Sequence, residues 1–151
     1  MMTSTPQRTP RQVMETYLEE VVTNGRLELI EELAQPDMID EANQAFNGPP
    51  GRAGLVAHAK GFRRNISGLS VTVNEIVAGD DAVMAKWTFT GKLTGPWLGQ
   101  TPTGKEFSCT AFSFFRLRDG LIDHYRVWLH ANLDTPVVFD SANPQALLAK
   151  G

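Results

Sequence analysis

The sequence contains a single cysteine, which excludes two common ways of stabilising a small protein. With Cys109 as the only cysteine among 151 residues, the chain has no internal disulfide and no cysteine-rich zinc site. A chain of this length buries about two-thirds of its unfolded surface, so it needs neither. Hydrophobic residues make up 42% and charged residues 21% of the sequence. This composition is typical of one globular domain.

The sequence also lacks an excess of basic residues, a long apolar run and an apolar N-terminal segment. It has 14 Lys and Arg against 17 Asp and Glu, a net charge of -3, with no basic stripe that would neutralise phosphates. No stretch reaches the ~20 apolar residues of a membrane span. Residues 1–12 have no apolar centre, unlike a signal peptide. We therefore expect a cytoplasmic protein that binds neither nucleic acid nor membrane.

The first 66 residues show helical periodicity. After an N-terminal arm of residues 1–10, expected to be disordered, Thr9 and Gln12 form a capping box around Pro10. Helices are predicted over residues 9–24, 27–33 and 52–65, with a short strand at residues 38–39.

The periodicity then changes to two, which is typical of strands. Strands are expected at about 69–73, 83–89, 105–117 and 121–131, with a bulge at Gly91 and a tight turn at residues 118–120. The tail, residues 134–151, is expected to form a short helix that begins at Asn143-Pro144. Helices separate from an antiparallel sheet indicate an α+β fold. We expect a cone-shaped barrel, made by a strongly curved antiparallel sheet under three N-terminal helices, with a small-molecule pocket inside.

Four short motifs carry a resemblance to a known family. They are GDDAV at 79–83, WTFTG at 87–91, PTGK at 102–105 and FRLRDGLIDHY at 115–125. In this order they resemble the SnoaL-like polyketide cyclases, which have the nuclear-transport-factor-like, or ketosteroid-isomerase-like, fold. The resemblance covers residues 11–133, which we take as the domain.

The resemblance implies an enzyme of polyketide-type secondary metabolism, including antibiotic biosynthesis, that uses neither metal nor organic cofactor. Members of the family act on apolar, polycyclic carbonyl compounds, and the best-known reaction is an intramolecular aldol ring closure. Related members hydroxylate polyketide rings, and other proteins of this fold only bind ligands. The implied function is a cofactor-free cyclase, with a ring hydroxylase or a non-catalytic binding module as the alternatives.

The last hairpin supplies the first candidate for acid–base catalysis. If residues 118–120 form the turn, Ser113 lies opposite Tyr125 and Phe115 lies opposite Asp123, all on one face with small residues that leave room for a ligand. An apolar surrounding disfavours a charged carboxylate, so Asp123 is suited to take a proton and return it. The family motif here, an acidic residue followed by an aromatic one, is matched by Asp123 and Tyr125. The alternative is a solvated aspartate near the turn.

Two other regions supply further candidates. Related folds carry a catalytic acid after the second helix, where this sequence has Asp40 and Glu41; the alternative is an exposed acidic turn. The polyketide-cyclase branch often has a histidine there instead. Tyr17 lies on the apolar stripe of the first helix, where a phenol can donate a hydrogen bond to an enolate or can simply pack in the core. Leu129 and Arg126 stand where the family often has acids.

The remaining candidates are contacts to the substrate and to a second subunit. Trp97, in a loop bounded by glycine and proline, is interpreted as a lid over the pocket. The expected substrate contacts are Asp40, His58, Phe62, Trp87, Phe89, Trp97, Ser113 and Phe115. The opposite sheet face would carry an aromatic and cationic patch suited to a homodimer, formed by Phe112, Phe114, His124, Arg126 and Trp128.

Overall fold

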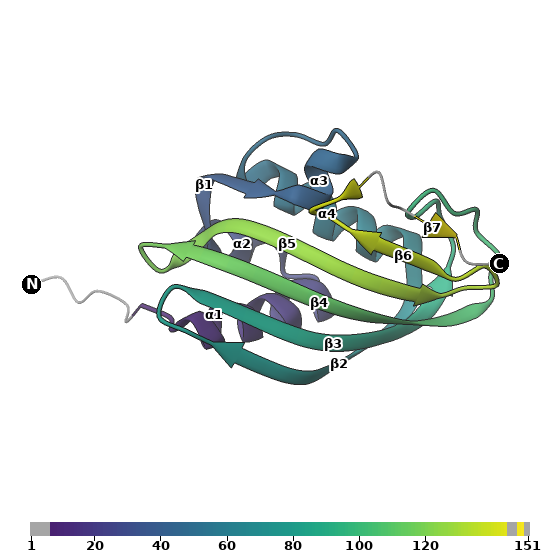
Figure 1. Ribbon diagram of the computed structural model, residues 1–151, viewed down its shortest axis with the longest axis horizontal. Coiled ribbons are helices and arrows are strands. Elements are labelled where there is room, and N and C mark those ends of the chain that lie inside the picture. Colours follow the sequence, from purple (N-terminus) through teal and green to yellow (C-terminus); the bar gives the residue numbers. More distant parts are fainter. Residues whose placement is uncertain (1–6, 145–147, 150–151) are drawn as a thin grey trace, which may run out of the picture.

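A curved sheet and a layer of helices make up the structure (Figure 1), a computed structural model that describes residues 7–144 and 148–149. The sheet has the strand order β2-β3-β4-β5-β6-β7, and β1 pairs with β5 in parallel. The strands are β1 (Ala34–Asp40), β2 (Ile66–Ala78), β3 (Ala82–Leu93), β4 (Glu106–Arg118), β5 (Leu121–Asn132), β6 (Val137–Asp140) and β7 (Leu148–Ala149). The sheet is open and curved, which confirms the predicted α+β fold.

The helices lie behind the sheet and cover its concave face (Figure 1). They are α1 (Pro10–Thr16), η1 (Tyr17–Thr23), η2 (Leu27–Leu29), α2 (Ile30–Leu33), α3 (Glu41–Ala45) and α4 (Arg52–Asn65). The predicted capping box of α1 is confirmed, since Gln12 N donates to Thr9 Oγ1 at 3.2 Å and Thr9 N donates to Gln12 Oε1 at 2.9 Å. Among the described residues, no helix is long and apolar enough to cross a membrane.

The core lies between this helical layer and the concave face of the sheet. Val13, Met14 and Leu18 pack from the first helical segment, and Leu55 packs from α4. The sheet contributes the inward side chains of its long strands, which alternate with exposed ones along β3, β4 and β5. This alternation is the period-two pattern of the sequence, and it decides which side chains face the helices.

The β4–β5 hairpin pairs two residues out of the predicted register. Phe115, rather than Ser113, lies opposite Tyr125. The turn uses two residues, Asp119 and Gly120, both with positive φ, instead of the expected three. A bulge then leaves Asp123 without a partner between the pairs Arg116↔His124 and Leu117↔Ile122. Together the shorter turn and the bulge account for the shift of two.

Three smaller predictions also need correction. Gly91 pairs regularly with Phe107 of β4, but the register of β2 shifts between Ser67↔Lys92 and Ser70↔Thr90, so the bulge lies on β2, opposite Gly91. A Cβ at Gly91 would lie 2.6 Å from Ile66 Cγ2. The alternative for Asp40 and Glu41, an exposed acidic turn, is wrong, because Asp40 is buried and caps helix α3, which begins at Glu41. Part of the tail, for which only a short helix was expected, forms strand β6. The tail helix expected after Asn143 and most of the N-terminal arm fall on residues outside the described ones.

Candidate acid–base site in an apolar cavity

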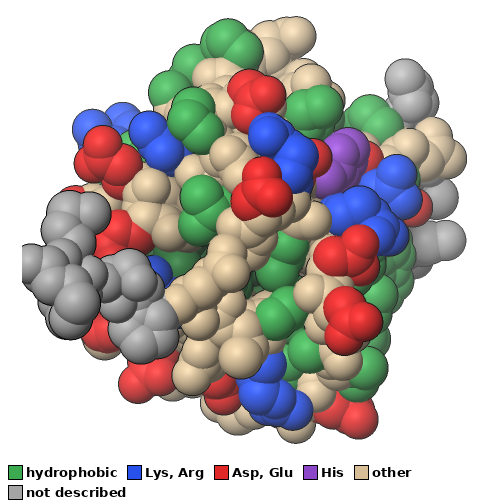
Figure 2. Space-filling model, turned by 90° about the vertical axis from the view of Figure 1, so that its left-hand side faces the viewer, with side chains coloured by type: hydrophobic (Ala, Val, Ile, Leu, Met, Phe, Trp, Pro, Cys, Tyr) green, Lys and Arg blue, Asp and Glu red, His purple; other side chains and the backbone are tan. Residues whose placement is uncertain are grey.

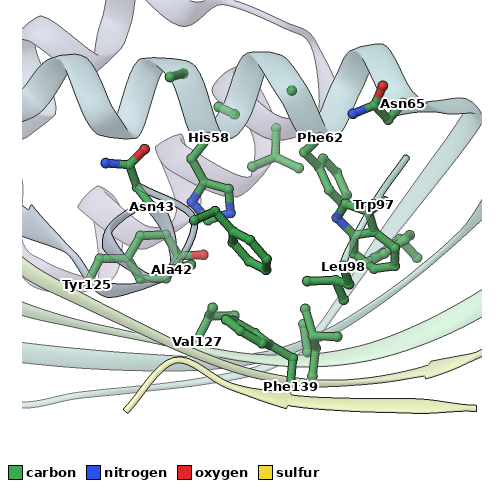
Figure 3. Close-up of a pocket in the computed structure, with 18 of the residues that line it drawn as sticks. Ala42, Asn43, His58, Phe62, Asn65, Trp97, Leu98, Tyr125, Val127 and Phe139 are labelled. Atoms are coloured by element: carbon green, nitrogen blue, oxygen red, sulfur yellow. The ribbon is translucent and has the colours of Figure 1, made fainter. Parts of the chain in front are cut away.

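A cavity of about 410 Å³ lies between the helices and the sheet. This volume is within the range that takes drug-sized ligands. Figure 3 shows His58 and Phe62 reaching into it from α4, with Tyr125 and Asn43 at one end, Trp97 and Leu98 at the other, and Val127 and Phe139 on the sheet side. Its walls are largely aromatic, formed by Phe46, Phe62, Trp87, Phe89, Trp97 and Phe139.

A carboxylate and an imidazole meet at one end of this cavity. Asp40 Oδ2 accepts a hydrogen bond from His58 Nδ1 at 2.7 Å. The other carboxylate oxygen, Oδ1, accepts from the backbone N–H of Asn43 at 3.2 Å and so caps helix α3. Asp40 is only 3% exposed, and its position opposite Tyr125 follows from the parallel pairing of β1 with β5. Both carboxylate oxygens therefore have a hydrogen-bond partner, and Oδ2 holds the histidine ring in one orientation.

The environment of His58 stabilises the protonated imidazolium, so the neutral ring readily accepts a proton. Burial disfavours the imidazolium, but the charge of Asp40 and its hydrogen bond outweigh burial, so the pKa of His58 is raised above its ordinary value. Because Nδ1 is occupied by Asp40, Nε2 is the nitrogen left for a ligand. Within residues 7–144, no side chain or backbone group makes a hydrogen bond to this Nε2. The cavity therefore contains an oriented imidazole with a free ring nitrogen.

Two phenols lie beside this pair. The rings of Tyr17 and Tyr125 have centroids 5.8 Å apart, and Tyr125 stacks on His58 at 5.8 Å. Burial raises the pKa of both phenols above its ordinary value, and the charge of Asp40 adds to this effect. Both side chains therefore stay protonated and act as hydrogen-bond donors. An imidazole and two phenols at one end of an apolar cavity suit proton transfer next to a carbonyl.

Asp123, the leading candidate from the sequence, lies elsewhere. Its Oδ1 accepts a hydrogen bond from Arg118 Nε at 3.0 Å, and Arg118 also binds Asp37 at 2.7 Å. The end view of Figure 2, onto the β4–β5 turn and β1, shows acidic and basic side chains gathered at the surface. The expected position of Asp123 inside the cone is wrong, because the bulge turns it outward. Its position does not support a role as the base.

Glu41 is placed on the outer side of the sheet and is fully bound there. Its Oε2 accepts from His124 Nε2 at 2.6 Å and from Arg126 Nε at 2.9 Å, and its Oε1 accepts from Ser141 Oγ at 3.1 Å. Burial alone would raise its pKa, but these hydrogen bonds outweigh burial and leave the pKa of Glu41 below its ordinary value. Glu41 therefore ties α3 to the sheet, away from the cavity.

The expected substrate contacts are only partly brought together. Phe62, Trp87, Phe89 and Trp97 line the cavity with His58. The remaining three do not line it, and all are buried: Asp40, Ser113 and Phe115. The sequence marks Asp40 as a candidate acid and, with His58, as a substrate contact, but it does not show their pairing. The available signal was an inward-facing histidine on a helix that follows a buried aspartate.

Trp97, the expected lid, lines the end of the cavity opposite His58 (Figure 3). Its ring lies 6.2 Å from Phe62, 5.9 Å from Phe89 and 5.7 Å from Phe107, measured between centroids. We predict that Trp97→Ala weakens binding of a fused-ring aromatic ligand by ~1–3 kcal/mol, as for loss of a buried aromatic contact. Calorimetric titration measures this, with Trp128→Ala on the outer face as the control. Equal affinity in wild type and Trp97→Ala contradicts a role in binding.

Comparison with known proteins gives both a family and a fold. A family model described as SnoaL-like polyketide cyclase matches residues 12–132. TsrD from Streptomyces laurentii is 24% identical, with a TM-score of 0.67 over 79% of this chain and 86% of its own. IdmH from Streptomyces antibioticus, a candidate polyketide cyclase, is 25% identical, with a TM-score of 0.63 over 82% and 92%. AclR from Streptomyces galilaeus, a candidate hydroxylase, is 24% identical, with a TM-score of 0.57 over 82% and 81%. No curated protein sequence matches the chain.

Proposed function

The chain belongs to the SnoaL-like polyketide cyclase family, and from this premise we propose that it catalyses intramolecular aldol cyclisation of an apolar, polycyclic carbonyl compound. The observation that carries the proposal is the 2.7 Å contact between His58 Nδ1 and Asp40 Oδ2 at the wall of the cavity. We assign His58 as the general acid–base and Asp40 as the residue that orients it. The reaction uses no cofactor and belongs to polyketide-type secondary metabolism.

The reaction takes place in three proton-balanced steps. His58 Nε2 removes a proton from the carbon next to a carbonyl, and the C–H electron pair forms the enolate. Tyr17 and Tyr125 donate hydrogen bonds to the enolate oxygen. The enolate carbon attacks a second carbonyl of the same molecule and closes the ring. The imidazolium then returns its proton to the new alkoxide, which restores neutral His58.

Each part of the cavity has a separate task in this scheme. The aromatic walls bind the fused rings and exclude water, which strengthens the hydrogen bonds at the reacting end. Asp40 stabilises the imidazolium that forms during the reaction and keeps the correct ring nitrogen facing the substrate. The enclosed shape holds the two carbonyl groups near each other, which lowers the entropic cost of ring closure.

Exchange of the substrate's acidic hydrogen for deuterium tests the first step alone. The probe is a polycyclic aryl β-keto ester that carries a second carbonyl placed for ring closure, followed by NMR in deuterated water. The proposal expects the enzyme to accelerate both the exchange and the appearance of the cyclised product. Tight binding with no exchange supports the binding-module alternative instead. Oxygen consumption with a hydroxylated ring supports the hydroxylase alternative.

We also propose that two copies associate through the outer face of the sheet. No described helix covers this face (Figure 1). On this face the ring centroids of Phe112 and Trp128 lie 5.6 Å apart. Trp128 is 37% exposed although it is a large apolar residue. The Glu41 carboxylate pairs with Arg126 and also contacts His124 Nε2, so it offsets the charge of Arg126 on this face. A second copy would cover this apolar surface.

Light scattering tests the association. At micromolar concentration we expect a mass about twice the 16.6 kDa of one chain. Trp128→Glu places a charge at the centre of the proposed contact and is expected to shift the mass to that of one chain. Glu75→Gln, at an exposed position of β2, serves as the control and should leave the mass unchanged. A wild-type protein that scatters as a single chain contradicts the proposal.

A further inference from the structure

We infer that Trp87 and Ser113 are positioning residues that direct the phenolic proton of Tyr125 toward the ligand cavity. The inference rests on the proposed function, because it concerns how one enolate-binding donor is oriented. It assigns a role to Ser113, which is buried and does not line the cavity, and to the indole nitrogen of Trp87, whose ring is part of the cavity wall. Neither the dyad of Asp40 and His58 nor the aromatic walls explain why a serine lies there.

The three side chains form a continuous hydrogen-bonded row across the sheet. Trp87 Nε1 donates to Ser113 Oγ at 3.0 Å, and Ser113 Oγ lies 3.1 Å from the hydroxyl oxygen of Tyr125. Ser113 is 0% exposed, and both flanking rings are buried. Ser113 makes these two side-chain hydrogen bonds and no other within the described residues.

Donor and acceptor counting gives the row a direction. The indole N–H of Trp87 can only donate, so Ser113 Oγ must accept from it. Ser113 still has one O–H to donate, and a buried hydroxyl that donates to nothing loses the free energy of that hydrogen bond. The remaining partner of Ser113 is the oxygen of Tyr125. Ser113 therefore donates to Tyr125, and the row runs from Trp87 through Ser113 to Tyr125.

This direction decides where the proton of Tyr125 points. Because Ser113 already donates to the Tyr125 oxygen, the phenolic hydrogen of Tyr125 must lie on another side. That side holds the cavity, which Tyr17 and Tyr125 both line, and the Tyr17 phenol, whose side-chain hydrogen bond with Tyr125 contributes to the pKa shifts of both residues. Asp40 lies beyond them, and its charge acts on both phenols. The row thus presents an oriented donor to an oxygen bound at the His58 end, before any ligand arrives.

The orientation has a consequence for binding that packing alone does not produce. A ligand oxyanion gains more from a pre-oriented donor than a neutral ligand of the same shape, because hydrogen bonds to charged groups are stronger. Removing Ser113 Oγ frees the hydroxyl of Tyr125 to rotate and takes away the polarisation supplied through the row. The loss should therefore fall on anionic ligands and spare neutral ones.

A matched pair of ligands measures this selectivity. We compare a nitro-substituted 2-naphthol, ionised at pH 8, with the same nitronaphthalene lacking the hydroxyl group, by titration with the full-length protein. Ser113→Ala should weaken binding of the naphtholate about 5-fold, the scale of one net hydrogen bond, and leave nitronaphthalene unchanged. Ser113→Thr, which keeps the hydroxyl, should recover the selectivity. Cys109→Ala, buried on the same strand face, is the control and should alter neither affinity.

Trp87→Phe keeps an aromatic ring and removes the first donor, so it tests the same row if Ser113→Ala does not fold. Like Ser113→Ala, it should reduce the affinity for the naphtholate relative to that for nitronaphthalene. An unchanged ratio in either folded variant overturns the inference, as does a wild-type protein without preference for the naphtholate. The test is independent of turnover: loss of deuterium exchange without loss of this ratio counts against the proposed reaction and leaves the row intact.

Discussion

Replacing His58 with glutamine is expected to lower both deuterium exchange and ring closure at least ~100-fold, since a positioned acid–base group contributes 10²–10⁴. Glutamine is close in size but has no nitrogen that accepts a proton near neutral pH. The aromatic walls remain, so binding of the polycyclic β-keto ester should change little. Rates are measured by NMR under saturating ligand, which separates turnover from affinity.

Two substitutions serve as controls for this result. His130→Gln makes the same chemical change at an exposed position on the outer face of the sheet, and it should keep the wild-type rate. Asp123→Asn removes the carboxylate that the sequence favoured. Because Asp123 pairs with Arg118 and does not line the cavity, we expect this variant to keep full activity. If Asp123→Asn collapses while His58→Gln remains active, the assignment of the base is wrong.

Replacing Asp40 with asparagine is expected to move the pKa of His58 from above its ordinary value to below it. In the wild type, burial lowers this pKa and the charge of Asp40 raises it by more. The amide keeps the shape of the carboxylate but has no charge, so burial is left as the dominant cause. NMR titration of the His58 ring protons measures both values. A pKa for His58 that is the same in wild type and Asp40→Asn contradicts the electrostatic coupling.

The same coupling predicts how stability depends on pH. The pKa of His58 is raised in the folded protein, so the folded state binds this proton more tightly than the unfolded state. The contribution to the free energy of unfolding is fully present below the unfolded pKa of about 6.5. It is lost as the pH rises through the folded pKa. Denaturant unfolding of wild type and Asp40→Asn should show this pH dependence in the wild type alone.

The element order was predictable because local signals agreed with the final structure. The capping box at Thr9 and Gln12 begins the first helix where the sequence placed it. The alternation along β3 also decided correctly which of its side chains face inward. Helical and strand periodicities depend on neighbouring residues, so they can be read from the chain without knowing the tertiary structure.

The position of Asp123 was not predictable in the same way. The tight turn was recognised, but its two-residue form depends on positive φ at Asp119 and Gly120, and a three-residue turn fits the same letters. The bulge beside it follows from burial of Ile122, which places the next residue outward. A register shift of one residue moves a side chain to the opposite face of a sheet. The two-residue turn and the bulge together therefore place Asp123 outside the cavity.

The pairing of Asp40 with His58 depends on contacts far apart in the chain. Strand β1 is short, and its parallel pairing with β5 places Asp40 opposite Tyr125, 85 positions later by their residue numbers. Helix α4 then brings His58 to the same point. The sequence marks each of the two residues as a candidate, but no local pattern indicates that the end of β1 and the middle of α4 meet. The site is therefore a product of topology rather than of a motif.

The most direct measurement of the central claim compares two pH midpoints in one protein. One is the midpoint of deuterium exchange, measured as kcat/KM against pH, and the other is the NMR titration of His58. If His58 is the base, exchange rises with pH and levels off above the pKa of His58, because only the neutral imidazole accepts the proton. The two midpoints should coincide in the wild type and move down together in Asp40→Asn. Exchange whose midpoint stays fixed while that of His58 moves would contradict the claim.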